Sequence, residues 1–249
     1  MTELNQIQEL CLNFKHTDFK YGTLYHVDFQ KVMNVLKKNT LKVDLILTDP
    51  PYNVDAKAKD QAKKNTEEEK VSYNDNKDEV EYLWFVSNFI WDAQSVSNKL
   101  VVSPGHSNVA TWCMFSVPDD FLFHNKPDGQ GWSKSARATK TEIYLVYGSV
   151  TSRKKFATNT IKANINHHIR YGPHPHPKPP ELYRKIISQL EPTVVFDPFL
   201  GSGTTGEVCE ELGIPWFGCE IVPKYINECI IPRCGKATKV VEKGSMLEL

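Results

Sequence analysis

The stretch TVVFDPFLGSGTTG, residues 193–206, decides the fold. Its first four residues form a β-branched and aromatic run that predicts a short strand, and its glycine-rich part predicts a tight turn into a helix. Thr204 and Glu207 have the spacing of a helix capping box, and Gly213 follows Leu212 where that helix is expected to end. Strand, glycine-rich turn and helix in this order predict an α/β fold with a doubly wound, mostly parallel sheet.

A carboxylate closes the next expected strand. Residues 216–220 form a mostly apolar run that ends at Glu220, about twenty residues beyond the glycines. In a doubly wound sheet, an acid at this spacing binds the ribose hydroxyls of a bound nucleotide. The sequence therefore predicts a cofactor that carries a nucleoside.

A second motif, Asp49-Pro50-Pro51-Tyr52, follows the apolar run at 43–47. Two consecutive prolines fix φ and keep the loop extended, so the Asp49 carboxylate and the Pro50 carbonyl are free to point away from the strand. These two acceptors suit the two protons of an exocyclic amine, and the Tyr52 ring suits the face of a planar base. Asp-Pro-Pro segments also occur as ordinary surface turns, so the motif gains its meaning from the cofactor loop.

Taken together and in order, residues 24–231 resemble the S-adenosylmethionine-dependent amino-methyltransferases of DNA. The likeness is to the group in which the Asp-Pro-Pro-Tyr loop precedes the cofactor loop. Besides the two loops and Glu220, it rests on Asp28 after an expected strand at 24–27 and on His174-Pro175-His176-Pro177-Lys178-Pro179, which is similar to a His-Pro-x-x-Lys-Pro element. The resemblance implies a Rossmann-like methyltransferase sheet with a small inserted DNA-recognition region.

The resemblance also implies the roles of individual residues. The catalytic loop would be Asp49, Pro50, Pro51 and Tyr52, with Asp49 preparing an amine for direct methyl transfer to a flipped-out base. Asp28 would meet the adenine of S-adenosylmethionine and Glu220 its ribose. No metal site is implied. The implied cofactor-binding residues are Asp28, Asp49, Lys178, Asp197, Pro198, Phe199, Gly201, Ser202, Gly203, Thr204, Thr205 and Glu220.

The implied substrate is N6 of adenine in duplex or single-stranded DNA, because the family's cytosine enzymes more often carry serine at the position of Asp49. Three alternatives stay open: N4 of cytosine in DNA, an amine of RNA or of a protein, and a non-catalytic DNA-binding partner. Family members act in restriction and modification and are often homodimers, so both are implied here as well.

The charge distribution is uneven, although the 249-residue chain has a formal net charge of zero. Residues 126–185 contain twelve lysines and arginines against three acids. A solvated surface would explain these charges equally well, but their place between the two motifs favours contacts to phosphates. The candidate DNA-binding residues are Lys134, Arg137, Lys140, Arg153, Lys154, Lys155 and Arg170.

The length favours one domain over 1–249. Within it we expect a catalytic half at 22–118, a target-recognition region at 119–172, a cofactor-binding half at 173–234 and a tail at 235–249. Six scattered cysteines without a CxxC pair, and four histidines between 167 and 176, make a poor case for a metal. With no apolar run of membrane-spanning length and no signal peptide in this sequence, we expect a cytoplasmic location and no membrane partner.

The remaining elements follow from periodicity. Strands are expected at 99–102, 121–124 and 141–147, and helices after the N-caps Asp28 and Asp78 and within 108–117. The polar stretch 53–77 is expected to be a mobile loop. Trp84 and Trp91 are expected in the core, and Glu142 is a weak site candidate because Thr141 stands where the family pattern has a histidine before the acid.

Overall fold

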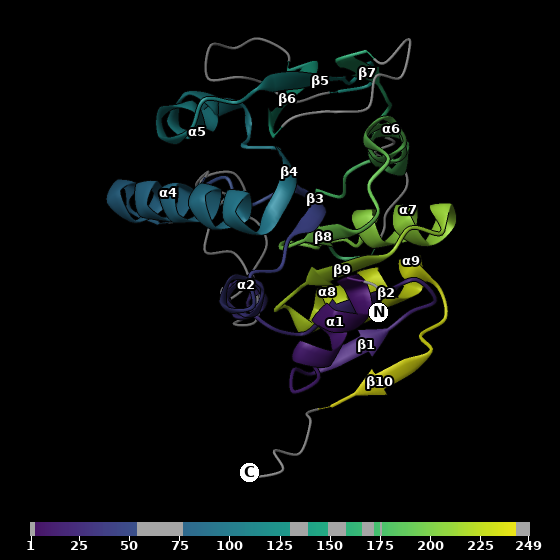
Figure 1. Ribbon diagram of the computed structural model, residues 1–249. Coiled ribbons are helices and arrows are strands. Elements are labelled where there is room, and N and C mark those ends of the chain that lie inside the picture. The colour runs from purple at the N-terminus through teal and green to yellow at the C-terminus, as the bar shows by residue number, and fades with distance from the viewer. Residues whose placement is uncertain are drawn as a thin grey trace.

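The strands lie in a single sheet within the part of the chain that the computed structural model describes, residues 3–53, 77–129, 139–148, 158–165, 172–174 and 176–242. The strand order is β10-β1-β2-β9-β8-β3-β4-β6-β5-β7, and Figure 1 shows it running from β10 at the bottom to β5 and β7 at the top. The strands are β1 (His16–Asp18), β2 (Gly22–Tyr25), β3 (Val43–Thr48), β4 (Ser97–Val102), β5 (Asp120–Asn125), β6 (Thr141–Tyr147), β7 (Thr160–Lys162), β8 (Val195–Asp197), β9 (Trp216–Cys219) and β10 (Lys239–Val241).

The centre of this sheet is parallel. Strands β2, β9, β8, β3 and β4 pair in parallel, whereas β6 joins β4 and β1 joins β2 in antiparallel fashion. Strand β3 pairs with β8 in the register Leu45↔Val195 and Ile46↔Phe196, so the ends that lead into Asp49 and Asp197 lie side by side. The predicted α/β, mostly parallel, Rossmann-like sheet is confirmed.

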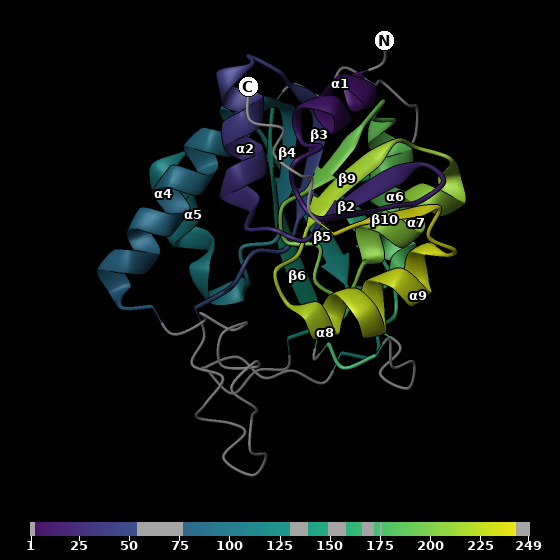
Figure 2. The same ribbon diagram turned by 90° about the horizontal axis from the view of Figure 1, so that it is seen from below.

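Helices cover both faces of the sheet, as Figure 2 shows. They are α1 (Glu3–Leu10), α2 (Phe29–Lys38), α4 (Glu79–Val96), the 3₁₀ turn η2 (His106–Asn108), α5 (Val109–Phe115), α6 (Pro180–Leu190), α7 (Thr204–Leu212), α8 (Pro223–Tyr225), the π turn η3 (Ile226–Ile230) and α9 (Ile231–Cys234). Helices α2, α4 and α5 lie on one face, and α6, α7 and α9 lie on the other.

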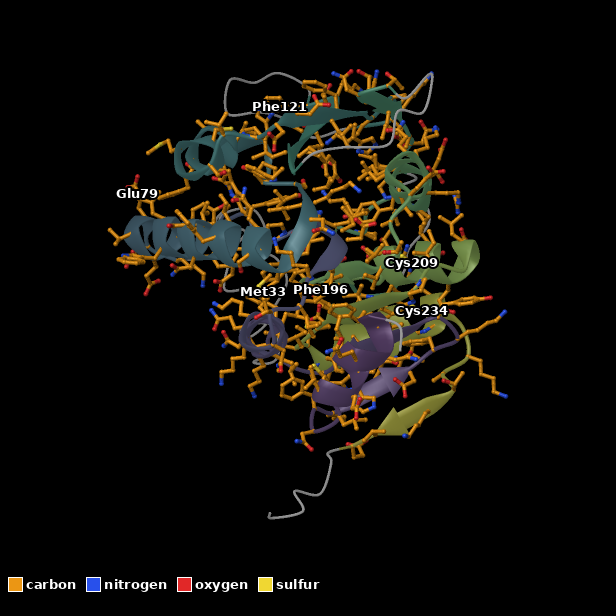
Figure 3. All side chains as sticks on the ribbon, viewed as in Figure 1. Met33, Glu79, Phe121, Phe196, Cys209 and Cys234 are labelled. Carbon is orange, nitrogen blue, oxygen red and sulfur yellow. The ribbon has the colours of Figure 1, made fainter. Side chains whose placement is uncertain are left out.

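Each face has its own hydrophobic cluster. Met33 of α2 and Phe196 of β8 belong to the first cluster, and Cys209 of α7 and Cys234 of α9 belong to the second (Figure 3). Along β3, Ile46 packs into the first cluster and its neighbours Leu45 and Leu47 into the second. Successive side chains of a strand point to opposite faces, so an unbroken apolar run is what a strand buried on both sides requires.

The two predicted aspartate caps are confirmed. The Asp28 carboxylate accepts a hydrogen bond from the Gln30 amide at 2.8 Å and begins α2. The Asp78 carboxylate accepts one from the Glu81 amide at 2.8 Å and begins α4. Each satisfies a backbone N–H that has no partner within its helix.

The predicted capping box of α7 is wrong. The N-cap is Gly203, which has a left-handed backbone (φ 84°) and makes no side-chain cap bond. Thr204 is therefore already in the helix, and its hydroxyl donates to the Lys178 carbonyl at 3.0 Å. Glu207 does not reach back to the cap because its carboxylate pairs with Arg233, at 2.9 Å from Nε. Gly213 ends the helix as predicted.

The prediction that Trp84 and Trp91 lie in the core is also wrong, because the two residues are 65% and 70% exposed. Val86, Phe89 and Ala93 form the buried face of α4, as expected. The two tryptophans are seven residues apart, which is about two helical turns, so they share the opposite, outward face.

Three short strands were not predicted. Strands β1, β7 and β10 have three residues each, too few for a period-2 pattern to stand out. Strand β10 comes from the tail and pairs with β1 in the register His16↔Val241, while Thr238 donates through its amide to the Asp18 carbonyl at 2.8 Å. The division into catalytic, target-recognition and cofactor-binding parts stays a prediction.

None of the helices in the described ranges is long and apolar enough to cross a membrane. The same ranges contain no cluster of three metal-ligating side chains, and all six cysteines, each of which is described, are free. The expected loop at 53–77 lies outside the described residues except at its two ends, as do His167 and His168.

Candidate active site

The Asp49 carboxylate stands at the carboxyl end of β3, inside a ring of polar groups. Its Oδ1 accepts a hydrogen bond from the Tyr52 hydroxyl, and its Oδ2 lies 3.3 Å from the Lys178 ammonium. The Tyr52 hydroxyl accepts from Lys178 at 2.8 Å and lies 2.9 Å from the Ser103 hydroxyl. Asp49 keeps 22% of its side chain exposed, so a substrate group can still reach it.

The Tyr52 ring is held by two neighbours. Gly105 has a left-handed backbone (φ 73°), and a Cβ at that position would lie 2.8 Å from the ring. Only glycine allows this approach without strain. The Asn108 amide group donates to the Tyr52 carbonyl at 2.5 Å and fixes the loop behind the ring.

The charges of this cluster depend on one another. Burial raises the pKa of the Asp49 carboxyl above its ordinary value, and the Lys178 ammonium and Tyr52 hydroxyl act against that rise. Burial by itself lowers the pKa of Lys178, but the carboxylates of Asp49 and Glu142 outweigh it and hold that pKa well above the ordinary value. The two acids thus keep a buried lysine charged.

Glu142 reaches the same cluster from β6. Its Oε2 lies 3.4 Å from the Lys178 ammonium and 3.2 Å from His124 Nδ1, and its Oε1 lies 3.3 Å from the Lys126 ammonium. Burial raises the pKa of the Glu142 carboxyl, but these three partners together hold it below its ordinary range. His124 lies directly opposite Glu142 in the β5–β6 register, so a histidine does flank this acid across the strands, although Thr141 precedes it in sequence.

A cavity of about 380 Å³ opens beside Asp49 and continues over the cofactor loop. Glu220 forms part of its lining and accepts three backbone hydrogen bonds, from Gly201 at 2.9 Å, Ile221 at 2.8 Å and Val222 at 2.9 Å. Burial raises the pKa of the Glu220 carboxyl to about 7, with the three N–H groups acting against the rise.

Gly201 is required where the loop passes His174. Its φ is 53°, and a Cβ there would lie 2.9 Å from His174 Nε2. The His174 ring also lies 4.8 Å from the Tyr225 ring, centroid to centroid. Burial lowers the pKa of His174 to about 3, so this wall of the cavity carries a neutral imidazole.

The structure brings many of the predicted site residues to one cavity but not all of them. Those that line it are Asp28, Asp49, Pro50, Pro51, Tyr52, Pro198, Phe199, Gly201 and Glu220. Those that lie outside its lining are Lys178, Asp197, Ser202, Gly203, Thr204 and Thr205. Their role in cofactor binding stays a prediction, and the contacts of each show what else it does.

Asp197 is the clearest case among those behind the loop. Its buried carboxylate accepts from the Thr48 hydroxyl at 2.7 Å, the Thr205 hydroxyl at 2.5 Å and the Phe199 amide at 3.1 Å. It therefore ties the end of β3 to the end of β8 and to α7. Burial raises the pKa of the Asp197 carboxyl to about 6, with the hydrogen bonds acting against the rise.

Sequence reasoning missed part of the lining. These residues are Val27, Phe29, Gln30, Lys77, Phe85, His174, His176, Cys219, Ile221, Val222 and Tyr225. Ile221 and Val222 directly follow Glu220, and His174 and His176 stand in the quoted proline-rich motif, so their positions carried a signal. Phe85 carried no sequence signal, because it belongs to α4, far from the motifs in sequence. Its ring lies 6.0 Å from the Phe199 ring, centroid to centroid.

Of the predicted DNA-binding residues, only Lys140 is described. Its ammonium donates to the carbonyls of Pro127 at 3.1 Å and Gly129 at 2.6 Å, which ties the turn after β5 to the start of β6. Lys134, Arg137, Arg153, Lys154, Lys155 and Arg170 lie outside the described residues. Their contact with DNA stays a prediction, as does that of Lys140.

The parallel sheet, the glycine loop that leads into α7, and the carboxylates at the ends of β3 and β9 define an α/β fold of the Rossmann-like class. Two solved structures share the fold. M1.HpyAVI in complex with SAM has a TM-score of 0.59 at 22% identity, with 86% of this chain and 100% of that chain covered. The cytosine-N4-specific PvuII DNA methyltransferase has a TM-score of 0.60 at 18% identity, with 86% and 88% covered.

Sequence comparisons find similar proteins among the DNA methyltransferases. Residues 122–231 match the family model described as DNA methylase. The type II methyltransferase M.HpaI of Haemophilus parainfluenzae is 24% identical over 234 residues, covering 79% of this chain and 69% of its own. M1.MboII of Moraxella bovis is 24% identical over 242 residues, covering 75% and 87%. These matches confirm the resemblance to the DNA amino-methyltransferases of restriction–modification type, with S-adenosylmethionine as cofactor.

Proposed function

We propose that this chain methylates the exocyclic N6 amine of adenine in DNA. The Asp49 carboxylate would accept a hydrogen bond from that amine after the base has left the DNA duplex. The observation that carries the proposal is that one cavity joins the Asp49 loop to Glu220 and the Phe199–Gly201 turn. An acceptor for an amine, at the end of β3, and an acceptor for ribose hydroxyls, at the end of β9, thus face the same space on either side of β8. Ligands of doubly wound sheets bind at such strand ends.

The lining suits S-adenosylmethionine. The Phe199–Gly201 backbone lines the cavity and would lie under its amino-acid part, since glycine is suited to a close approach of backbone and ligand. Glu220 would accept from the ribose hydroxyls, and Asp28 would face the adenine edge. When bound, this cofactor supplies a methyl group on a sulfonium, which an amine can attack directly.

The Asp49 loop prepares that amine. The lone pair of an exocyclic amine is delocalised into the base ring, which makes the nitrogen a poor nucleophile. Hydrogen bonds accepted by the Asp49 carboxylate and the Pro50 carbonyl favour a pyramidal nitrogen whose lone pair is localised. The nitrogen bonds the methyl carbon as the carbon–sulfur bond breaks, and one amine proton leaves to solvent. Alignment and fixed charges supply the acceleration.

The target base must leave the duplex to reach Asp49. Unstacking costs roughly a few kcal/mol. Stacking on the Tyr52 ring would return about 1–3 kcal/mol of it. Adenine is favoured over cytosine by the aspartate at position 49, since the related cytosine enzymes more often carry serine there.

The test is methyl transfer from labelled S-adenosylmethionine to duplex DNA, single-stranded DNA and RNA, each digested to nucleosides and resolved by mass. Asp49→Asn is compared with Asp44→Asn, which changes the same residue type at the other end of β3. We expect N6-methyladenine from the wild type and Asp44→Asn, and none from Asp49→Asn. If the product were N4-methylcytosine, the substrate would be cytosine and the assignment to adenine would be refuted. Cofactor binding without product on any nucleic acid would refute the proposed reaction.

A further inference from the structure

The Lys178 ammonium lies between two carboxylates, those of Asp49 and Glu142. The ammonium lies 3.3 Å from Asp49 Oδ2 and 3.4 Å from Glu142 Oε2, and it donates to the Tyr52 hydroxyl at 2.8 Å. An ammonium paired with a single carboxylate usually sits at about 2.7–2.9 Å. Both longer distances indicate an ammonium that is drawn to two partners and closes fully on neither.

Glu142 is fixed from its far side. Lys126 and His124 hold its carboxylate at 3.3 and 3.2 Å, and both side chains are buried, with relative exposures of 8% and 1% for their residues. His124 is anchored in turn by the Ala163 carbonyl, which lies 2.9 Å from Nε2. Glu142, Lys126 and His124 do not line the cavity beside Asp49. Glu142 therefore acts at a distance from any ligand there.

From this geometry we infer that Lys178 and Glu142 are positioning residues of the methyl-accepting site: Lys178 orients the Asp49 carboxylate, and Glu142 holds Lys178 back so that Asp49 can still accept the amine. The inference rests on the proposed function. It gives Lys178 a place in the amine half of the site, whereas the family resemblance implied a place in the cofactor half.

The reason for two acids is the number of donors on an ammonium. Lysine carries three N–H groups and no acceptor, so an ammonium closed onto Asp49 would occupy the oxygen that the substrate amine needs. Glu142 takes one of the donors and the Tyr52 hydroxyl takes another. Asp49 is left with a counter-charge nearby and with an oxygen that still has accepting capacity.

Carboxylates and ammonium groups stand close together in this cluster, so the removal of either kind of charge shifts the Asp49 equilibrium in a known direction. Loss of Lys178 leaves Asp49 buried without its cation, which favours the protonated acid. Loss of the Glu142 charge removes a like charge and lets Lys178 close on Asp49, which favours the carboxylate. The other titratable groups that act on Asp49 or on this pair are Tyr52, Lys126, His124, Tyr144, Tyr183 and Asp197.

The test follows the Asp49 carboxyl itself, by carbon-13 NMR titration of protein labelled at aspartate side chains, with the signal assigned by its loss in Asp49→Asn. The variants are Lys178→Met and Glu142→Gln. The matched control is Asp44→Asn, because Asp44 also faces a buried lysine, Lys99, at 3.4 Å. Lys178→Gln, which keeps a donor without the charge, serves if Lys178→Met does not fold.

We expect the Asp49 midpoint to rise by about one to three pH units without the Lys178 charge and to fall by about one in Glu142→Gln. Asp44→Asn should leave it unchanged. Midpoints that move in the same direction in both variants, or an unchanged midpoint in Glu142→Gln, would overturn the inference.

Methyl transfer gives the second readout. The acidic limb of the single-turnover rate should move to higher pH in Lys178→Met, and the plateau rate should fall at least tenfold in Glu142→Gln, with cofactor affinity unchanged in both. A loss of cofactor affinity that accounts for the slower rate would place the pair in the cofactor half and refute the inference. If the wild type methylates no nucleic acid, the proposed function fails, while the titration still decides the inference.

Discussion

Replacement of Glu220 by glutamine should weaken cofactor binding and loosen the glycine loop together. The carboxylate uses both oxygens, Oε2 for the Gly201 amide and Oε1 for the amides of Ile221 and Val222. Glutamine can keep its oxygen toward Ile221 and Val222, but its NH₂ group then faces the Gly201 N–H. Two donors meet where a donor and an acceptor met before.

The size of both effects follows from these contacts. A buried N–H without an acceptor costs about 1–3 kcal/mol, so the free energy of unfolding should fall by that amount. Loss of a charged acceptor for a ribose hydroxyl costs about 1.5–3 kcal/mol of binding. That corresponds to a dissociation constant about 10 to 150 times higher.

The pH dependence adds a sign. Burial raises the pKa of Glu220 to about 7 from its ordinary value of 4.5, so the stability that the protonated acid contributes is complete below pH 4.5 and is lost as the pH rises through 7. The amount is about 3 kcal/mol. Affinity for the cofactor runs the other way, since the carboxylate accepts from ribose, and should rise as the pH passes 7. Glutamine does not titrate, so the contribution of residue 220 to both dependences should vanish.

The assay is isothermal titration calorimetry with S-adenosylmethionine between pH 6 and 8.5, combined with urea unfolding of the free protein. Glu228→Gln is the control, because Glu228 is exposed on the turn that follows the same strand. A Glu220→Gln protein that binds as tightly as the wild type at pH 8 would refute the assignment of Glu220 to the ribose. A wild-type affinity that is flat across pH 7 would refute the role of its ionisation.

Two further substitutions test the loop and the strand pair behind it. Gly201→Ala should raise the cofactor dissociation constant at least tenfold in calorimetry because its Cβ would meet His174, whereas Gly235→Ala, which has a positive φ but no atom within 4 Å, should leave binding unchanged and so separate contact from backbone strain. Thr48→Val should lower the free energy of unfolding in urea by about 1–3 kcal/mol, because the Asp197 carboxylate loses a buried donor; an unchanged stability would show that this hydrogen bond does not brace the two strands.

The parts of the site that sequence alone predicted depend on local signals. Asp28 and Asp78 each cap the helix that begins one residue later, so their neighbours in sequence are also their neighbours in space. Asp49 and Glu220 directly follow apolar strands, and parallel strands end at a common edge. Their shared cavity follows from that rule and needs no further information.

The failures depend on contacts between distant segments. Thr204 was predicted to cap α7, but Gly203 is the N-cap. The Thr204 hydroxyl instead donates to the Lys178 carbonyl. Glu142 looked marginal because the histidine before it is missing. His124 supplies a partner from the neighbouring strand, eighteen residues away, and only the β5–β6 register reveals it.

The order of strands has a consequence for how the chain folds during synthesis. Strands β2 and β3 are consecutive in sequence, yet β9 and β8 lie between them in the sheet. A growing chain therefore leaves the facing edge of β3 unpaired until β8 (Val195–Asp197) has been made, and that of β2 unpaired until β9 (Trp216–Cys219) has been made. Pairings this remote form slowly, and exposed edges are prone to join other chains. The last two central strands to emerge carry the cofactor loop and Glu220, so S-adenosylmethionine would bind, and stabilise the molecule, only once that gap is filled.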